Sequence, residues 1–202
     1  MNSIEFQKNL VFWSIFKKVE KIYNETDTTN MKTKKGFTQN SEIISKNLIK
    51  IILDECKLDY SEAGSQQSKD FRIKIGNDIT LYLEIKKTDT NRIFFNDTMP
   101  DKNIYYIILF TGNKKNKKTC IGVNGFEFIK NDLWVYEYQK KIDELKREYQ
   151  DTTKFPRHNM FVYPRPTYSS DITFLLQKQS VKEVKAKINK QRTYKPRKNS
   201  LQ

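Results

Sequence analysis

Two carboxylates and a lysine occupy even-numbered positions in the segment 70–88, whose apolar residues occupy odd-numbered ones. The three residues are Asp70, Glu84 and Lys86, and a glycine-containing turn separates the first from the other two. Side chains alternate between the two faces of a strand, so all three are expected on the face opposite the apolar residues. Two carboxylates and a lysine on one face suit the binding of a divalent cation and the activation of a water molecule.

The register of this predicted hairpin decides whether the two carboxylates meet. A three-residue loop, Gly76–Asn77–Asp78, pairs Ile75 with Ile79 and supplies residues that tolerate unusual backbone dihedrals. In the same register Asp70 lies opposite Glu84. Like charges at opposed positions destabilise a hairpin unless a positive group lies between them, and Mg²⁺ is the expected group.

A second interpretation of the same residues stays open at this point. Acids and lysines are common on solvated strand faces, and Arg72 or Lys74 would then neutralise the carboxylates. Spacing alone does not separate this interpretation from a metal site, because short motifs match by accident.

The surrounding sequence predicts a mixed central β-sheet flanked by helices, an α/β fold. Helical spacing over 3–23 and 42–56 predicts two helices, the second capped by Ser41. The inward residues expected on the second helix are Ile43, Ile44, Leu48, Ile51, Ile52 and Leu53. Further expected elements are strands at 103–110 and 119–126, a helix at 131–149, and a strand, turn and strand within 158–176. We expect a single domain over residues 1–177 and a basic tail over 178–202.

Composition limits the possible partners and metal sites. The net charge of +14 favours an acidic partner, with nucleic acid ahead of a membrane. No apolar run approaches the roughly 20 residues of a membrane span, and the N-terminus lacks the features of a secretory signal, so we expect a cytoplasmic protein without membrane association. Two cysteines, Cys56 and Cys120, and one histidine, His158, leave a hard, carboxylate-bound cation as the expected metal.

Residues 41–125 resemble the PD-(D/E)XK nuclease superfamily, and specifically the type II restriction endonucleases. Asp70 matches the first acid and Glu84-Ile85-Lys86 matches the E-x-K element, although Lys69 replaces the usual proline. The resemblance implies a restriction-endonuclease-like core in which Asp70, Glu84 and the Ile85 backbone carbonyl hold Mg²⁺, with Mn²⁺ able to substitute. It also implies that Lys86 assists the attacking water and that Glu42 is a further acid near the metal.

The expected function is that of a Mg²⁺-dependent, sequence-specific double-stranded DNA endonuclease of a type II restriction-modification system. A homodimer is expected, with a second apolar face of the N-terminal helix as its interface. Two alternatives remain: a structure-specific nuclease acting on junctions or mismatches, and a non-catalytic nucleic-acid-binding protein whose acids are incidental.

DNA contacts are expected from basic regions and from polar loops. Residues 113–118, the helix at 138–148 and the tail are candidates for phosphate contacts. Arginine and amide side chains beside the hairpin, or in the segment after the long helix, are candidates for reading bases. These candidates are Gln66, Gln67, Ser68, Asn91, Arg92, Asn96, Arg157 and Arg165.

Overall fold

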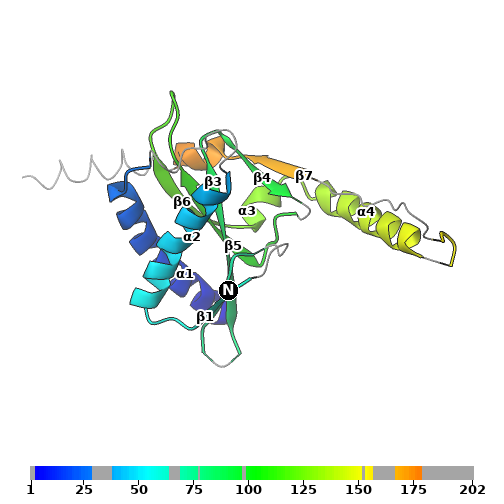
Figure 1. The fold of residues 1–202 in the computed structure, drawn as a ribbon, viewed down its shortest axis with the longest axis horizontal. Coiled ribbons are helices and arrows are strands. Elements are labelled where there is room, and N and C mark those ends of the chain that lie inside the picture. Colours follow the sequence, from blue (N-terminus) through cyan, green and yellow to red (C-terminus); the bar gives the residue numbers. More distant parts are fainter. Residues whose placement is uncertain are drawn as a thin grey trace, which may run out of the picture.

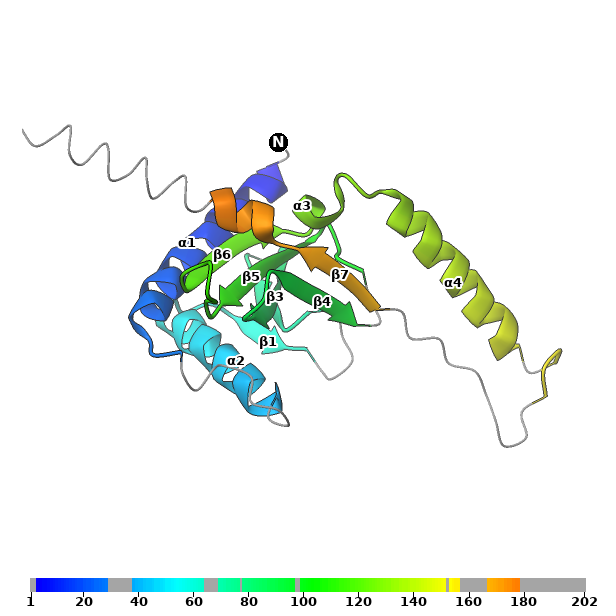
Figure 2. The same cartoon turned by 90° about the horizontal axis from the view of Figure 1, so that it is seen from above.

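The computed structural model describes residues 3–28, 38–63, 69–76, 78–96, 99–151, 153–156 and 167–178. A central five-stranded mixed sheet carries helices on one face and a small second sheet with short helical segments on the other (Figures 1 and 2). The predicted α/β class and mixed sheet are therefore confirmed. Each face of the sheet buries its own apolar cluster, so two packed layers position the central strands from both sides.

Helices α1 (Ser3–Glu25) and α2 (Thr38–Glu55) cover the first face. Aromatic and branched residues at helical spacing on α1 are buried against the sheet, as the sequence predicts. Helix α2 begins at Thr38, so the prediction that Ser41 caps it is wrong and Ser41 lies within the helix.

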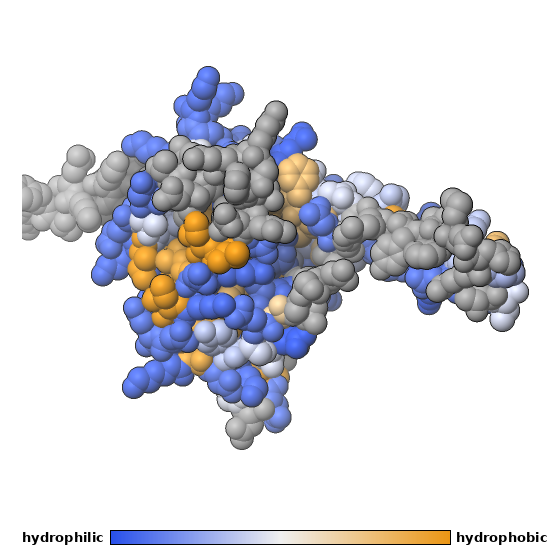
Figure 3. Space-filling view, in the orientation of Figure 1, coloured by the Kyte–Doolittle hydropathy of each residue, from blue (hydrophilic) through white to orange (hydrophobic). Residues whose placement is uncertain are grey.

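Only one stripe of α2 faces the core. Ser45, Ile49, Ile52 and Leu53 are buried, whereas the predicted inward residues Ile43, Ile44 and Ile51 are exposed. A helix that packs on a sheet buries a single stripe of its surface. The apolar residues of α2 extend around more of the helix than this stripe, so some of them stay exposed. The small Ser45 side chain, which the apolar pattern missed, lies on the buried stripe. Figure 3 shows the resulting apolar patch over the region of α2.

The central sheet has the order β1-β2-β3-β5-β6. Its strands are β1 (Tyr60–Glu62), β2 (Phe71–Lys74), β3 (Thr80–Thr88), β5 (Ile104–Phe110) and β6 (Thr119–Asn124). Strands β3 and β5 are parallel, and the other neighbours are antiparallel. Every residue of β5 is buried, as expected for a continuous apolar run in the middle of a sheet.

The β2–β3 hairpin has the predicted register. Phe71 lies opposite Leu83, and the Ile75 N–H donates to the Ile79 carbonyl at 2.7 Å. Gly76 adopts φ 78° at the turn, a conformation that glycine takes without a steric penalty. The odd-numbered residues of both strands are buried against α1 and α2, so the even-numbered ones face the opposite layer.

The opposite layer contains a two-stranded sheet and two short helical segments. Strand β4 (Arg92–Asn96) pairs with β7 (Thr167–Asp171), and α3 (Phe126–Ile129) packs beside them. The strand predicted after Pro166 is present as β7 but is shorter than expected, because residues 173–178 are helical, and the strand predicted before Pro164 lies outside the described residues. Ile172, Leu175 and Leu176 are buried at helical spacing, and the Asp171 carboxylate accepts the Thr173 N–H at 2.7 Å, as in a helix cap.

Helix α4 (Trp134–Gln150) corresponds to the predicted helix at 131–149. None of its residues is buried, and it projects from the body of the molecule (Figures 1 and 2). No helix in the described parts of the chain has the length and apolar character needed to cross a bilayer.

Candidate active site

Asp70 is joined to strand β3 through both its backbone and its side chain. Its N–H donates to the Leu83 carbonyl at 2.9 Å, and its carboxylate Oδ2 accepts the Ile85 N–H at 2.7 Å. The side chain is only 14% exposed. The carboxylate therefore lies at the start of β2, directly beside Glu84-Ile85, with its orientation set by the sheet backbone.

Lys46 of α2 makes the second contact to Asp70. Its Nζ lies 2.8 Å from Asp70 Oδ1 and 3.0 Å from Glu42 Oε1, so a lysine lies between the two acids. Burial lowers the pKa of Lys46, but its hydrogen bonds to Asp70 and Glu42 outweigh this effect and raise it to about 12. Sequence reasoning missed Lys46, although its position four residues after Glu42 is the spacing of a helical ion pair.

Glu84 and Lys86 form an ion pair in a partly desolvated environment. Glu84 Oε1 lies 2.5 Å from Lys86 Nζ, and their side chains are 12% and 19% exposed. Burial raises the pKa of Glu84, repulsion from Asp70 adds to this rise, and Lys86 only partly offsets it. Two carboxylates that repel each other in a low-dielectric setting favour the binding of a cation.

Aromatic rings line this face of the sheet. Lys86 Nζ lies 4.8 Å from the centroid of the Phe95 ring, and Lys69 Nζ lies 3.9 Å from that of Tyr82. Tyr106 pairs with Glu84 across β3 and β5, and its hydroxyl accepts the Asp101 N–H at 3.1 Å. Burial and the nearby Glu84 raise the pKa of Tyr106, so it stays protonated. These rings limit the access of water to the charged residues.

The Asp70 and Glu84 carboxylates suit a Mg²⁺ ion that takes only a few of its ligands from the protein. The described residues contain no group of three or more His, Cys, Asp or Glu side chains placed around one position. Mg²⁺ needs only one or two carboxylates, because it keeps several waters and takes substrate phosphate oxygens. Asp70 and Glu84 supply hard oxygen donors, and the ammonium groups of Lys46 and Lys86 neutralise them in the metal-free protein.

The predicted DNA-reading residues are only partly described. The Asn91 side-chain oxygen accepts hydrogen bonds from Asn113 at 3.2 Å and Asn116 at 3.5 Å, which joins the loop after β3 to the turn between β5 and β6. Arg92 and Asn96 are exposed on β4. Gln66, Gln67, Ser68, Arg157 and Arg165 lie outside the described residues, as do His158 and the tail beyond Lys178.

One lysine of the basic turn at 113–118 has a structural role. Lys118 Nζ donates to the carbonyls of Tyr23 at 2.8 Å, Asn24 at 3.1 Å and Thr26 at 2.6 Å. These carbonyls lie at the C-terminal end of α1, where a cation satisfies unpaired acceptors and the helix dipole. Lys114, Lys115 and Lys117 are exposed and remain candidates for phosphate contacts.

The chain matches no protein-family model, no curated protein and no solved structure. A function therefore has to be inferred from the chemistry of Asp70, Glu84 and Lys86.

Proposed function

We propose that the protein is a Mg²⁺-dependent, sequence-specific double-stranded DNA endonuclease of a type II restriction-modification system. The observation that supports this most directly is the proximity of Asp70 to the Glu84-Ile85 backbone, with Lys86 paired to Glu84 on the same face. Both carboxylates are mostly shielded from solvent and each pairs with a lysine, so four charged groups that are costly to desolvate lie together at one end of the hairpin.

The chain's residues would divide the chemistry as follows. Asp70, Glu84 and the Ile85 carbonyl would hold Mg²⁺, which supplies charge stabilisation at the scissile phosphate. The Ile85 N–H keeps the Asp70 carboxylate turned toward β3. Lys86, held between Glu84 and the Phe95 ring, would orient the attacking water toward phosphorus.

Positive charge around the site supports a polyanionic substrate. Lys46 and Lys86 pair with the two carboxylates, Lys69 lies over the Tyr82 ring on the same strand pair, and the whole chain carries a net charge of +14. Such charges attract a phosphodiester backbone without selecting a sequence. Selection of a sequence would fall to side chains outside the site, among which Arg92 and Asn96 are exposed.

Digestion of supercoiled plasmid and of branched DNA in the presence of Mg²⁺ tests the proposal. Discrete plasmid fragments support a sequence-specific endonuclease. Cleavage confined to junctions or mismatches identifies a structure-specific nuclease, and intact DNA that is nevertheless bound identifies a binding protein. The Asp59→Asn variant is the control and should cut as the parent does, because it removes a carboxylate away from the proposed site. The Asp59 side chain is 68% exposed and pairs with Lys74 at the far end of the hairpin.

Replacing Lys46 with methionine is expected to tighten Mg²⁺ binding by about tenfold or more. The change removes an ammonium group 2.8 Å from Asp70, while the Ile85 N–H still holds the carboxylate. Two unit charges about 4 Å apart repel each other by about 4 kcal/mol at an effective dielectric of 20. This repulsion between Lys46 and the cation exceeds the roughly 1.5–3 kcal/mol of the hydrogen bond between Lys46 and Asp70 that the variant loses. Calorimetric titration with Mg²⁺ in the absence of DNA measures the effect.

Lys50→Met is the matched control for this experiment. Lys50 lies one turn along α2 and pairs with Glu62 at 2.6 Å, so its replacement removes the same charge away from Asp70. Weaker Mg²⁺ binding in Lys46→Met than in Lys50→Met would show instead that the metal requires Lys46 to orient Asp70.

A further inference from the structure

Helix α4 carries a largely exposed apolar stripe, which described residues contact at its two ends, where Tyr138 lies edge-to-face with Tyr168 and Tyr149 stacks on Phe155. Val135, Tyr138, Ile142, Leu145 and Tyr149 follow one another at alternating spacings of three and four residues. This is the spacing of a coiled-coil seam, in which each residue packs between residues of a facing helix. Tyr138, Leu145 and Tyr149 are each 50% exposed, and no α4 residue is buried.

A helix of this kind needs a packing partner. Most helix stability in proteins comes from the packing of an apolar face against other elements rather than from helix propensity. The 17 residues of α4 project from the body (Figure 2), and none of them is buried by the described residues. Helix α1 also exposes Phe6, Leu10 and Trp13, but that row ends at Lys17 and is shorter.

We propose that α4 pairs in antiparallel orientation with α4 of a second copy of the chain. The charges beside the seam favour this partner and direction. In a parallel pair Lys141 would face Lys146 of the second copy, whereas an antiparallel pair that stacks Ile142 on Leu145 places Lys141 opposite Glu148. Symmetry repeats this attractive contact. Among the described residues neither Lys141 nor Glu148 takes part in an ion pair.

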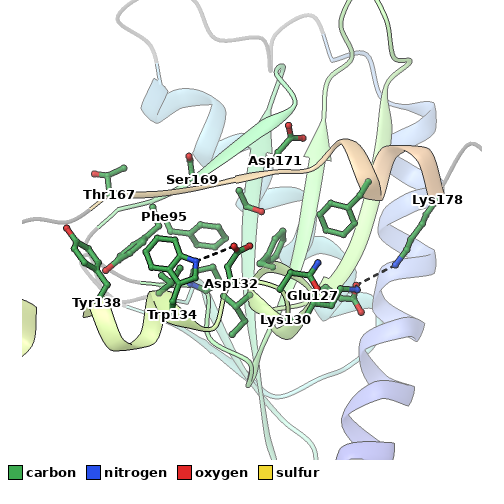
Figure 4. A pocket seen from close by; sticks show the side chains of 18 residues that line it. Phe95, Glu127, Lys130, Asp132, Trp134, Tyr138, Thr167, Ser169, Asp171 and Lys178 are labelled. Atoms are coloured by element: carbon green, nitrogen blue, oxygen red, sulfur yellow. Dashed lines mark hydrogen bonds and ion pairs between the residues drawn. The ribbon is translucent and has the colours of Figure 1, made fainter. Parts of the chain in front are cut away.

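A cavity at the base of α4 suits the far end of the second helix. It has a volume of about 790 Å³, and Trp134, Val135 and Tyr138 line it together with Tyr168 and Phe174. Figure 4 shows Trp134 and Tyr138 beside one another at one side of it. The same antiparallel register brings Tyr149 of the second copy opposite Tyr138, at the edge of this cavity.

The end of α4 carries an aromatic pair that matches the cavity. Tyr149 stacks on Phe155 with ring centroids 4.7 Å apart and an interplanar angle of 17°. Both rings are exposed in the single chain. Insertion of this pair into the aromatic-lined cavity of the other copy would bury apolar surface on both partners. The dimer does not depend on nuclease activity or on bound metal.

Sedimentation of the full chain in EDTA, over a range of protein concentrations, tests the interface. The parent is expected to form a dimer, and Leu145→Asp is expected to remain a monomer with unchanged circular dichroism. Lys141→Glu should weaken dimerisation by about tenfold or more, because two attractive contacts become repulsive. The Lys141→Glu/Glu148→Lys double variant should restore it. Lys140→Glu is the control, since this side chain is 77% exposed on the outer side of the helix.

Disulfide trapping identifies the direction of the pair. A Lys141→Cys/Glu148→Cys variant in a Cys56→Ser background should form an intermolecular disulfide, whereas Lys141→Cys/Lys146→Cys should not. A monomeric parent overturns the proposal. If Leu145→Asp then also lowers the stability of the monomer, the chain's own residues cover the stripe. A dimer that the double charge variant fails to restore overturns the antiparallel register.

Discussion

Glu84→Gln and Lys86→Ala are each expected to reduce Mg²⁺-dependent DNA cleavage by on the order of 10³-fold. Glu84→Gln keeps the size of the side chain but removes one of the two charges proposed to hold the cation. Lys86→Ala removes the group proposed to orient the attacking water. Neither side chain belongs to the cluster packed under α1 and α2, so the fold should persist. Single-turnover cleavage, with circular dichroism to monitor folding, measures the result.

The two variants are expected to differ in DNA affinity when metal is absent. Glu84 is a desolvated carboxylate beside the proposed phosphate position, so its neutralisation relieves repulsion and metal-free binding should be at least as tight as in the parent. Lys86→Ala loses a positive charge and should bind slightly more weakly. Fluorescence anisotropy in EDTA separates these outcomes.

Lys74→Ala is the matched control for the lysine. Lys74 lies in the same hairpin and points to the same face, but it is 66% exposed and pairs with Asp59. Its removal should leave cleavage close to that of the parent. Cleavage at the parent's rate by both Glu84→Gln and Lys86→Ala would identify Asp70, Glu84 and Lys86 as a merely structural strand face.

Gly125→Ala is expected to destabilise the protein by about 3 kcal/mol or more, at the upper end of the range for overpacking. A Cβ atom at this position would lie 1.9 Å from the Asp101 carbonyl oxygen and 3.0 Å from Tyr106 Cε2. The obstacle is backbone, and the Gly125 N–H also donates to the Ile104 carbonyl at 2.9 Å, so the segment has little freedom to move away. Urea unfolding measures the loss.

Gly76→Ala separates a steric clash from backbone strain. No atom lies within 4 Å of a Cβ built at Gly76, but its φ of 78° is unfavourable for alanine. This variant should lose only about 1–2 kcal/mol. Equal losses of unfolding free energy in Gly125→Ala and Gly76→Ala would contradict this prediction. They would show that the backbone at Asp101, whose N–H donates to the Tyr106 hydroxyl, moves aside for the added methyl group.

The sequence predicted the parts of the site that depend on local periodicity. Alternation from Phe71 to Ile85 determined the hairpin faces, and the glycine-containing turn determined the register. The fully apolar run at 103–110 predicted the buried strand that the structure has as β5. These predictions needed no knowledge of tertiary contacts.

Contacts that depend on how separate elements pack could not be predicted in this way. Lys46 reaches Asp70 only because Ser45 and Ile49 face the sheet, and that choice of stripe is made by the whole core. Ile43, Ile44 and Ile51 are exposed, so the apolar residues of α2 predicted a wider buried face than the helix has. The helical turn at 173–178 was missed because its aromatic and β-branched residues favour strands, whereas the spacing of Ile172, Leu175 and Leu176 is helical.

The link between Lys118 and the end of α1 bears on how the chain folds during its synthesis. The lysine is separated from Tyr23 by 95 residues, and the strand that covers Phe12 and Phe16 directly follows it. At translation rates of about 5–20 residues per second, α1 leaves the ribosome roughly 5–20 s before Lys118 and β6 do. During that interval its aromatic face is open to chaperones and to other nascent chains. The apolar cluster between α1, α2 and the central sheet is therefore completed late, through contacts distant in sequence. It cannot be completed before the ribosome has released β6.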